Sequence, residues 1–296
     1  MKIIGHEIQL KKLKNIVDTD KVGNAYIFDG IDGIGKFTIA KEFAKGLLCI
    51  NETIKPCGEC SACRTFDETN DLIIVEPDGN MIKVDDIRKM KDELMLKPIT
   101  SNRKIAIINN AEVMNEQAQN ALLKILEEPP EYVTIILVTS SKEKLLYTIK
   151  SRCTLFKFNP LSDEEVKEYF NNDVSDDLLT YSRGSIGTII KLQENNDTDI
   201  IERLVSSLKY TSLIDMMKEV NSLKEEKYVK ENLQDVLGYF MYWYYKDMKE
   251  NKNNNIKAIE CVEDTRSNIL RNANVDIALD RMMINLWKWG RTCKKL

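Results

Sequence analysis

The residues with the clearest chemical potential form a glycine-rich stretch, Gly30-Ile31-Asp32-Gly33-Ile34-Gly35-Lys36-Phe37. Its spacing matches G-x-x-x-x-G-K-[ST], in which backbone N–H groups and the lysine bind phosphate and the last hydroxyl holds Mg²⁺. The last position carries a phenylalanine, so the metal-binding hydroxyl is missing. The stretch keeps the residues of a phosphate cradle, which are Gly30, Gly33, Gly35 and Lys36.

A second group needed for metal-assisted chemistry is also missing. Enzymes with this loop carry an aspartate at the end of a neighbouring strand, where it holds the metal. Here the β-branched segment Lys104–Asn109 ends in Asn109 and continues with Asn110. An amide is a weaker ligand for a hard cation than a carboxylate, and Asn110 cannot act as a base. The sequence therefore predicts no hydrolysis here, with inert binding of ATP or ADP left open.

Four cysteines form the second chemical signal, with the spacing C-x7-C-x2-C-x2-C. Tetrahedral zinc accepts four thiolates, and a C-x2-C turn brings two sulfurs together. Since no histidine or further ligand lies nearby, we expect a closed, structural zinc knuckle over residues 49–63. An iron–sulfur cluster and four unrelated buried thiols are the alternatives. The predicted ligands are Cys49, Cys57, Cys60 and Cys63.

The elements that must position these residues alternate between strands and helices. An apolar run precedes the glycine-rich stretch, and Lys36–Leu48 follows it with apolar residues at helical spacing. Such alternation predicts a parallel sheet covered by helices on both faces. The expected strands are Asn24–Asp29, Leu72–Glu76, Lys104–Asn109, Val133–Val138 and Thr154–Phe158, and the further helices are Val84–Leu96 and Asn115–Glu128.

Beyond residue 159 the pattern becomes entirely helical. Ser162 and Glu165 have the spacing of a capping box that opens a helix. A polar stretch, Gln193–Asp197, separates this helical segment from a longer one. We expect an α/β domain over 1–159, a small helical lid domain over 160–195, and an all-α domain over 196–296.

The composition narrows the function classes. The chain has 296 residues, a net charge of −4 and 30% charged residues, which does not suit a dedicated polyanion-binding protein. Its seven cysteines are an odd number with four clustered, which favours metal binding in a reducing compartment over a disulfide framework. No signal segment or membrane-length apolar run is present. We therefore expect a soluble, cytoplasmic protein with no membrane partner.

A longer set of motifs resembles one family. The segment Asn120–Pro130 (Asn-Ala-Leu-Leu-Lys-Ile-Leu-Glu-Glu-Pro-Pro), an apolar strand, and then Ser151-Arg152-Cys153 are similar to the AAA+ clamp-loader subunits of DNA replication. The cysteine cluster after the loop helix resembles the zinc module of the bacterial members. The resemblance covers about residues 1–190 by motif, and the remainder matches in being helical and of suitable length for a collar domain.

The resemblance implies a role in a hetero-oligomer. Clamp-loader subunits form an open ring that uses ATP to place a sliding clamp on primed DNA, and their C-terminal collars hold the ring together. The implied role is a non-hydrolysing stator that lends Arg152, with Ser151 and Cys153 of its motif, to the ATP site of an adjacent motor subunit. In Arg183–Gly187, which resembles the family's lid motif, Gly187 stands where motor subunits carry a sensing arginine.

Two other functions stay open on the sequence. The chain could be an ATP-hydrolysing motor subunit of the same family, which predicts ATP turnover that depends on Lys36. It could also be a stand-alone zinc module for nucleic acid, which predicts DNA binding with a steep salt dependence. An aromatic run, Tyr239–Tyr245, could stack on bases, but its helical spacing favours a core or a subunit interface.

Overall fold

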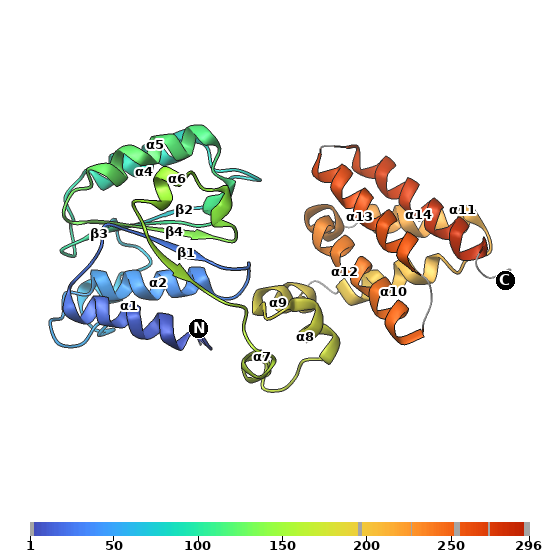
Figure 1. Cartoon of the computed structure of the whole chain (residues 1–296), viewed down its shortest axis with the longest axis horizontal. Helices are drawn as coiled ribbons and strands as arrows, with labels where there is room; N and C mark the ends of the chain where they lie inside the picture. Colours follow the sequence, from blue (N-terminus) through green and yellow to red (C-terminus); the bar gives the residue numbers. More distant parts are fainter. Residues whose placement is uncertain (1–2, 195–196, 226, 252–254, 272, 293–296) are drawn as a thin grey trace. The chain divides into compact units, whose positions relative to one another are not determined.

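The computed structural model describes residues 3–194, 197–225, 227–251, 255–271 and 273–292. It divides into two compact units, Met1–Thr188 and Ile189–Leu296, with the boundary inside one helix (Figure 1). Residues 195 and 196, where we placed the start of the last domain, lie outside the described residues. Among the described residues, no helix has the length and apolar content that crossing a membrane requires.

The first unit is built on one five-stranded parallel sheet with the strand order β2-β3-β4-β1-β5. This result confirms the predicted fold class and the five expected strands. Since all strands run the same way, their carboxyl ends meet at one edge. The strands are β1 (Ala25–Asp29), β2 (Leu72–Val75), β3 (Lys104–Ile108), β4 (Val133–Thr139) and β5 (Thr154–Lys157).

Both faces of this sheet are buried, because successive side chains of each strand point to opposite sides. In β1, Ala25 and Ile27 join one apolar core, whereas Tyr26 and Phe28 join the other. Helices α1 (Glu7–Thr19) and α2 (Lys36–Leu48) cover one face (Figure 1). The other face is covered by α4 (Val84–Leu94), α5 (Glu116–Glu127) and α6 (Tyr147–Lys150).

After β5 the chain continues as short helices, α7 (Asp163–Tyr169), α8 (Asp176–Ser182) and α9 (Ile186–Glu194). The predicted capping box is present: Glu165 N–H donates to Ser162 Oγ at 3.2 Å, and Ser162 N–H donates to Glu165 Oε2 at 2.7 Å. The unit boundary falls within α9, so the expected three-domain division stays a prediction.

A buried aspartate joins the start of β2 to the turn that leads into β3. Asp71 is 1% exposed, and its carboxylate accepts backbone hydrogen bonds from Ile99, Thr100 and Ser101 at 2.8, 2.7 and 2.9 Å. Burial alone would raise the pKa of Asp71. The three backbone donors and the Ser101 hydroxyl outweigh burial and lower this pKa below its usual 3.8.

We predict that Asp71→Asn lowers the free energy of unfolding by about 2 kcal/mol, because buried N–H groups lose a charged acceptor. The folded-state pKa lies below the unfolded value, so the stabilisation is complete above 3.8 and is lost as pH falls through the folded-state pKa. Urea unfolding of both proteins should show a large difference near neutral pH and a small one in strong acid. An equal difference at both pH values would contradict this role.

The second unit is all-helical, and its helices share one apolar core. Leu233, Val236, Leu237, Phe240 and Tyr244 of the long helix are buried in that core. The core interpretation of the aromatic run is therefore confirmed for Phe240 and Tyr244. The helices are α10 (Asp197–Ser207), α11 (Leu213–Glu225), α12 (Lys227–Asn251), α13 (Ile256–Leu270) and α14 (Val275–Thr292).

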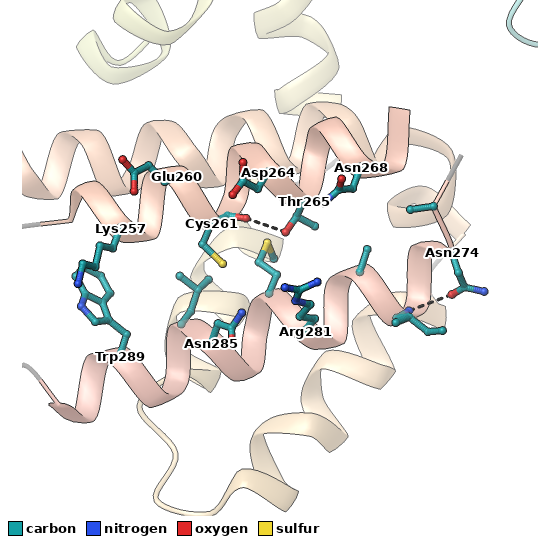
Figure 2. Close-up of a pocket in the computed structure, with 15 residues that line it drawn as sticks. Lys257, Glu260, Cys261, Asp264, Thr265, Asn268, Asn274, Arg281, Asn285 and Trp289 are labelled. Atoms are coloured by element: carbon teal, nitrogen blue, oxygen red, sulfur yellow. Dashed lines mark hydrogen bonds between the residues drawn. The ribbon is translucent and has the colours of Figure 1, made fainter. Parts of the chain in front are cut away.

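A groove of about 770 Å³ runs between α13 and α14, and Figure 2 shows its polar lining. Glu260 and Asp264 contribute negative charge, and Lys257 and Arg281 contribute positive charge. Burial raises the pKa of the Cys261 thiol on the same wall. A groove with both signs of charge does not have the concentrated basic surface that nucleic-acid binding needs.

Candidate functional site

The glycine-rich loop has the geometry of a strand–loop–helix phosphate cradle. It leaves the buried strand β1 and enters α2, whose N-terminus is capped by Gly35. Gly33 and Gly35 have φ values of +75° and +91°, a region that side chains rarely adopt. A Cβ on Gly30 would lie 2.4 Å from the Phe158 carbonyl oxygen. The conformation of the loop therefore depends on glycine at these positions.

Lys36 is folded into this loop. Lys36 is only 5% exposed, and its Nζ donates to the Ile31 carbonyl oxygen at 2.6 Å. Burial lowers the pKa of the Lys36 amine, and the carboxylates of Asp32, Glu112 and Asp29 offset part of this shift. The cation that would meet phosphate oxygens is thus satisfied by the chain's own oxygens.

Two acidic residues near the loop were missed by the sequence reasoning. Asp29 ends β1, and its carboxylate accepts the Lys142 backbone N–H at 3.2 Å and pairs with Lys142 Nζ at 3.6 Å. Glu112 accepts a hydrogen bond from the Ser140 hydroxyl, and its second oxygen is buried without a partner. Asp29 was visible as a strand-end carboxylate, whereas no sequence signal placed Glu112 beside Lys36.

The positions expected to lack metal-binding groups lie at the same sheet edge as the loop. Asn109 follows β3, and its side-chain N–H donates to Glu76 at 3.1 Å. Asn110 has a left-handed backbone with φ of +52°. Phe37 packs against the apolar core of the α2 face. His6 is half-buried, and its Nε2 donates to the Ile34 carbonyl of the loop at 3.0 Å.

The four predicted cysteine ligands converge. Their sulfur atoms all lie within 4.8 Å of one another, with Cys49–Cys60 at 3.9 Å and Cys57–Cys63 at 4.0 Å. Cys49 terminates α2, and Cys60 precedes the short helix α3 (Ser61–Arg64). Tetrahedral Zn–S bonds of about 2.3 Å place sulfurs roughly 3.8 Å apart, so the donor set fits zinc.

The environment of the thiols favours stepwise deprotonation. Burial opposes the thiolate of Cys60, but hydrogen bonds from the Ile50 and Cys63 backbone and from neighbouring thiols lower its pKa to about 6. Burial raises the pKa of Cys63 to about 12. Four close thiols cannot all ionise together without a cation, because like charges oppose one another. The cluster can therefore hold a divalent metal with thiolate affinity.

Arg152 lies in the short connection between α6 and β5. Its guanidinium donates to the Thr148 carbonyl at 2.9 Å and pairs with Glu127 at 2.8 Å. The side chain keeps 34% exposure, whereas the neighbouring Cys153 packs into the core, and burial raises the pKa of that thiol to about 12. Ser151 donates to Thr148 as well. The tripeptide is thus anchored by its cysteine and presents its arginine outward.

The sheet places Arg152 far from the chain's own phosphate loop. In the β1–β5 pair, Tyr26 is opposite Thr154 and Asp29 is opposite Lys157. Arg152 precedes β5, whereas the loop follows β1. Arg152 therefore lies where the parallel strands begin, and the loop lies where they end. Arg152 is level with residue 24 in this register, six residues before Gly30, so at about 3.3 Å per residue the separation along the strands is roughly 20 Å. The structure therefore gathers the loop and the asparagine pair at one edge and does not bring Arg152 to them.

The five-stranded parallel sheet and the strand–loop–helix at its edge define an AAA+ type of protein. The model of the family described as "DNA polymerase III, delta subunit" matches residues 5–162, which is more than half of the chain. The chain belongs to this clamp-loader family.

Two relatives agree with this assignment. The chain is 33% identical over 194 residues to DNA polymerase III subunit delta' of Bacillus subtilis, covering 64% of this chain and 59% of the relative. It is 32% identical over 199 residues to subunit tau/gamma of Haemophilus influenzae, covering 67% of this chain and 29% of the relative. The chain thus spans less than two thirds of these relatives.

A crystal structure with the same fold is the gamma subunit-related protein of DNA polymerase III from Thermotoga maritima. It superimposes with a TM-score of 0.57 at 23% identity, over 95% of this chain and 99% of that one. This likeness concerns the fold.

Proposed function

We propose that the chain is a delta-prime type subunit of a DNA polymerase III clamp loader, which braces the ring and does not hydrolyse ATP itself. Family membership and the delta' relative support the assembly. The loss of the hydroxyl at Phe37 and of the carboxylate at Asn109 supports the absence of hydrolysis, because nothing at these positions grips Mg²⁺.

The observation that carries the proposal is the position of Arg152. Because it lies at the amino ends of the strands, whereas the chain's own loop lies at their carboxyl ends, its guanidinium is available to a nucleotide held by a neighbouring subunit. A guanidinium supplied in trans stabilises the charge that develops on the transferred phosphoryl group. Arg152 must exchange its bond with Glu127 for that phosphate, and an exposed pair of this kind is worth only about 0–1 kcal/mol.

The cysteine cluster has a structural role in this proposal. Cys49, Cys57, Cys60 and Cys63 would hold zinc, which would organise the segment between α2 and β2. All four ligand positions are filled by protein sulfur, so the site leaves no open position for substrate. Zinc supplies folding energy to this segment when bound.

The partners follow from the proposed assembly. The helical segment 160–195 would serve as the lid and residues 196–296 as the collar that joins sister subunits. The motor subunits, a delta-type subunit, the sliding clamp and primed DNA would then be reached through the complex, which would act in the cytoplasm at the replisome. The mixed-charge groove between α13 and α14 does not favour a separate nucleic-acid module.

The motor function is a second candidate, because tau and gamma subunits are among the relatives. Steady-state ATP turnover by the purified chain separates the two, with Lys36→Ala as the matched control. We expect both proteins to give the same background rate, since the loop cannot complete a metal site. Turnover that Lys36→Ala abolishes would establish the motor and overturn the stator.

A further inference from the structure

The tip of the phosphate loop is joined directly to the first turn of α9 and to Ser185, the residue before that helix. The backbone N–H of Gly187 donates to the Gly33 carbonyl oxygen at 2.8 Å. The Ser185 hydroxyl donates to the Asp32 carbonyl oxygen, also at 2.8 Å. Ser185 is 2% exposed. Two segments about 150 residues apart in the chain thus make a partly buried polar contact.

This contact requires glycine on both sides. A Cβ on Gly187 would lie 2.7 Å from Gly33 Cα, closer than real Cβ atoms approach another atom. A Cβ on Gly33 would lie 2.3 Å from Ser185 Oγ, and the φ of +75° at Gly33 disfavours a side chain as well. Any residue with a side chain at 187, including an arginine, would therefore force the two backbones apart.

The contact also completes the start of α9. The first N–H groups of a helix have no partner within it. Here the loop carbonyl of Gly33 satisfies the Gly187 N–H, while Ser185 Oγ accepts the Thr188 N–H at 3.2 Å. The Ser185 hydroxyl therefore caps the helix and holds the loop with the same atom. Every donor and acceptor of these bonds belongs to the chain itself.

We propose that Asp32, Gly33, Ser185 and Gly187 form a nucleotide-independent latch that fixes the start of α9 on the phosphate loop. In this latch, the close packing against Gly33 requires glycine at position 187. The glycine is therefore more than the absence of a sensing arginine. The latch would give the proposed stator a rigid first unit, and only this link to the stator role rests on the proposed function. The contact itself depends on the glycine pair.

Hydrogen exchange at the Gly187 amide tests the latch in the unaltered chain. We expect this amide to exchange roughly tenfold or more slowly than an open helix N-terminus, since it opens only when the loop and α9 separate. Saturating MgATP should leave the rate unchanged. Exchange at the unprotected rate, or a rate that MgATP alters, would overturn the latch.

Thermal unfolding of Gly187→Ala gives an independent test, with Gly290→Ala in α14 as the matched control. An added Cβ at Gly290 meets nothing within 4 Å. We expect the Tm to fall by about 4 °C or more for Gly187→Ala and to stay within about 1 °C for the control. Equal Tm values would overturn the latch without touching the stator, which the turnover assay tests separately. If Gly187→Ala does not fold, the exchange measurement decides.

Discussion

Arg152→Ala should reduce ATP hydrolysis at the one site that this arginine serves by about 10³-fold or more, once the chain is assembled with its motor subunits. The guanidinium neutralises charge that appears only in the transition state, so its loss should lower turnover with little change in nucleotide affinity. The measurement is clamp- and DNA-stimulated ATP turnover of the reconstituted complex. Because several sites contribute to the total rate, that rate should fall by the contribution of the one affected site.

The matched control for this prediction is Arg152→Lys. Lysine keeps the charge but not the planar fork that binds two phosphate oxygens, so it should recover only part of the rate. Both variants should assemble normally by size-exclusion chromatography, because Arg152 is a surface residue anchored through Cys153. Full turnover with Arg152→Ala in an intact complex would contradict the trans role.

Cys60→Ser should remove the metal and unfold the segment between α2 and β2. A structural zinc site contributes apparent binding free energy on the order of 10 kcal/mol, and serine cannot replace a thiolate ligand. Metal analysis should find about one zinc per unaltered chain and almost none in the variant. Limited proteolysis should then cut the variant within residues 49–64, while the sheet stays protected.

Cys261→Ser is the control for the cysteine variant. Cys261 belongs to the all-helical unit and is not one of the four clustered cysteines, so this change should leave the zinc content unaltered. Iron in place of zinc would support the cluster alternative. An unaltered protein that contains no metal after purification without chelators would contradict the knuckle.

The sequence predicted the first unit well because its elements are defined locally. The β-branched runs at Lys104–Ile108 and Val133–Thr139 are buried on both faces, so they lack polar alternation and are easy to recognise as central strands. The capping box at Ser162 is similarly local. The division of the helical region depends on long-range packing, which periodicity alone does not contain.

The site was predictable where spacing brings ligands together and unpredictable where tertiary structure does. The four cysteines lie within one short segment, so their convergence followed from sequence. Glu112 approaches Lys36 only because β3 and β1 end at the same sheet edge. The pairing of Gly33 with Gly187 spans most of the first unit, and a glycine in sequence does not show what approaches it.

The most direct test compares Lys36→Ala and Arg152→Ala side by side in the fully reconstituted complex, with stimulated ATP turnover as the readout. The chain's own loop should be dispensable, so Lys36→Ala should retain the unaltered rate, whereas Arg152→Ala should lose the contribution of the neighbouring site. The reverse pattern, in which Lys36→Ala lowers turnover and Arg152→Ala does not, would show that this chain hydrolyses ATP itself and would contradict the stator function.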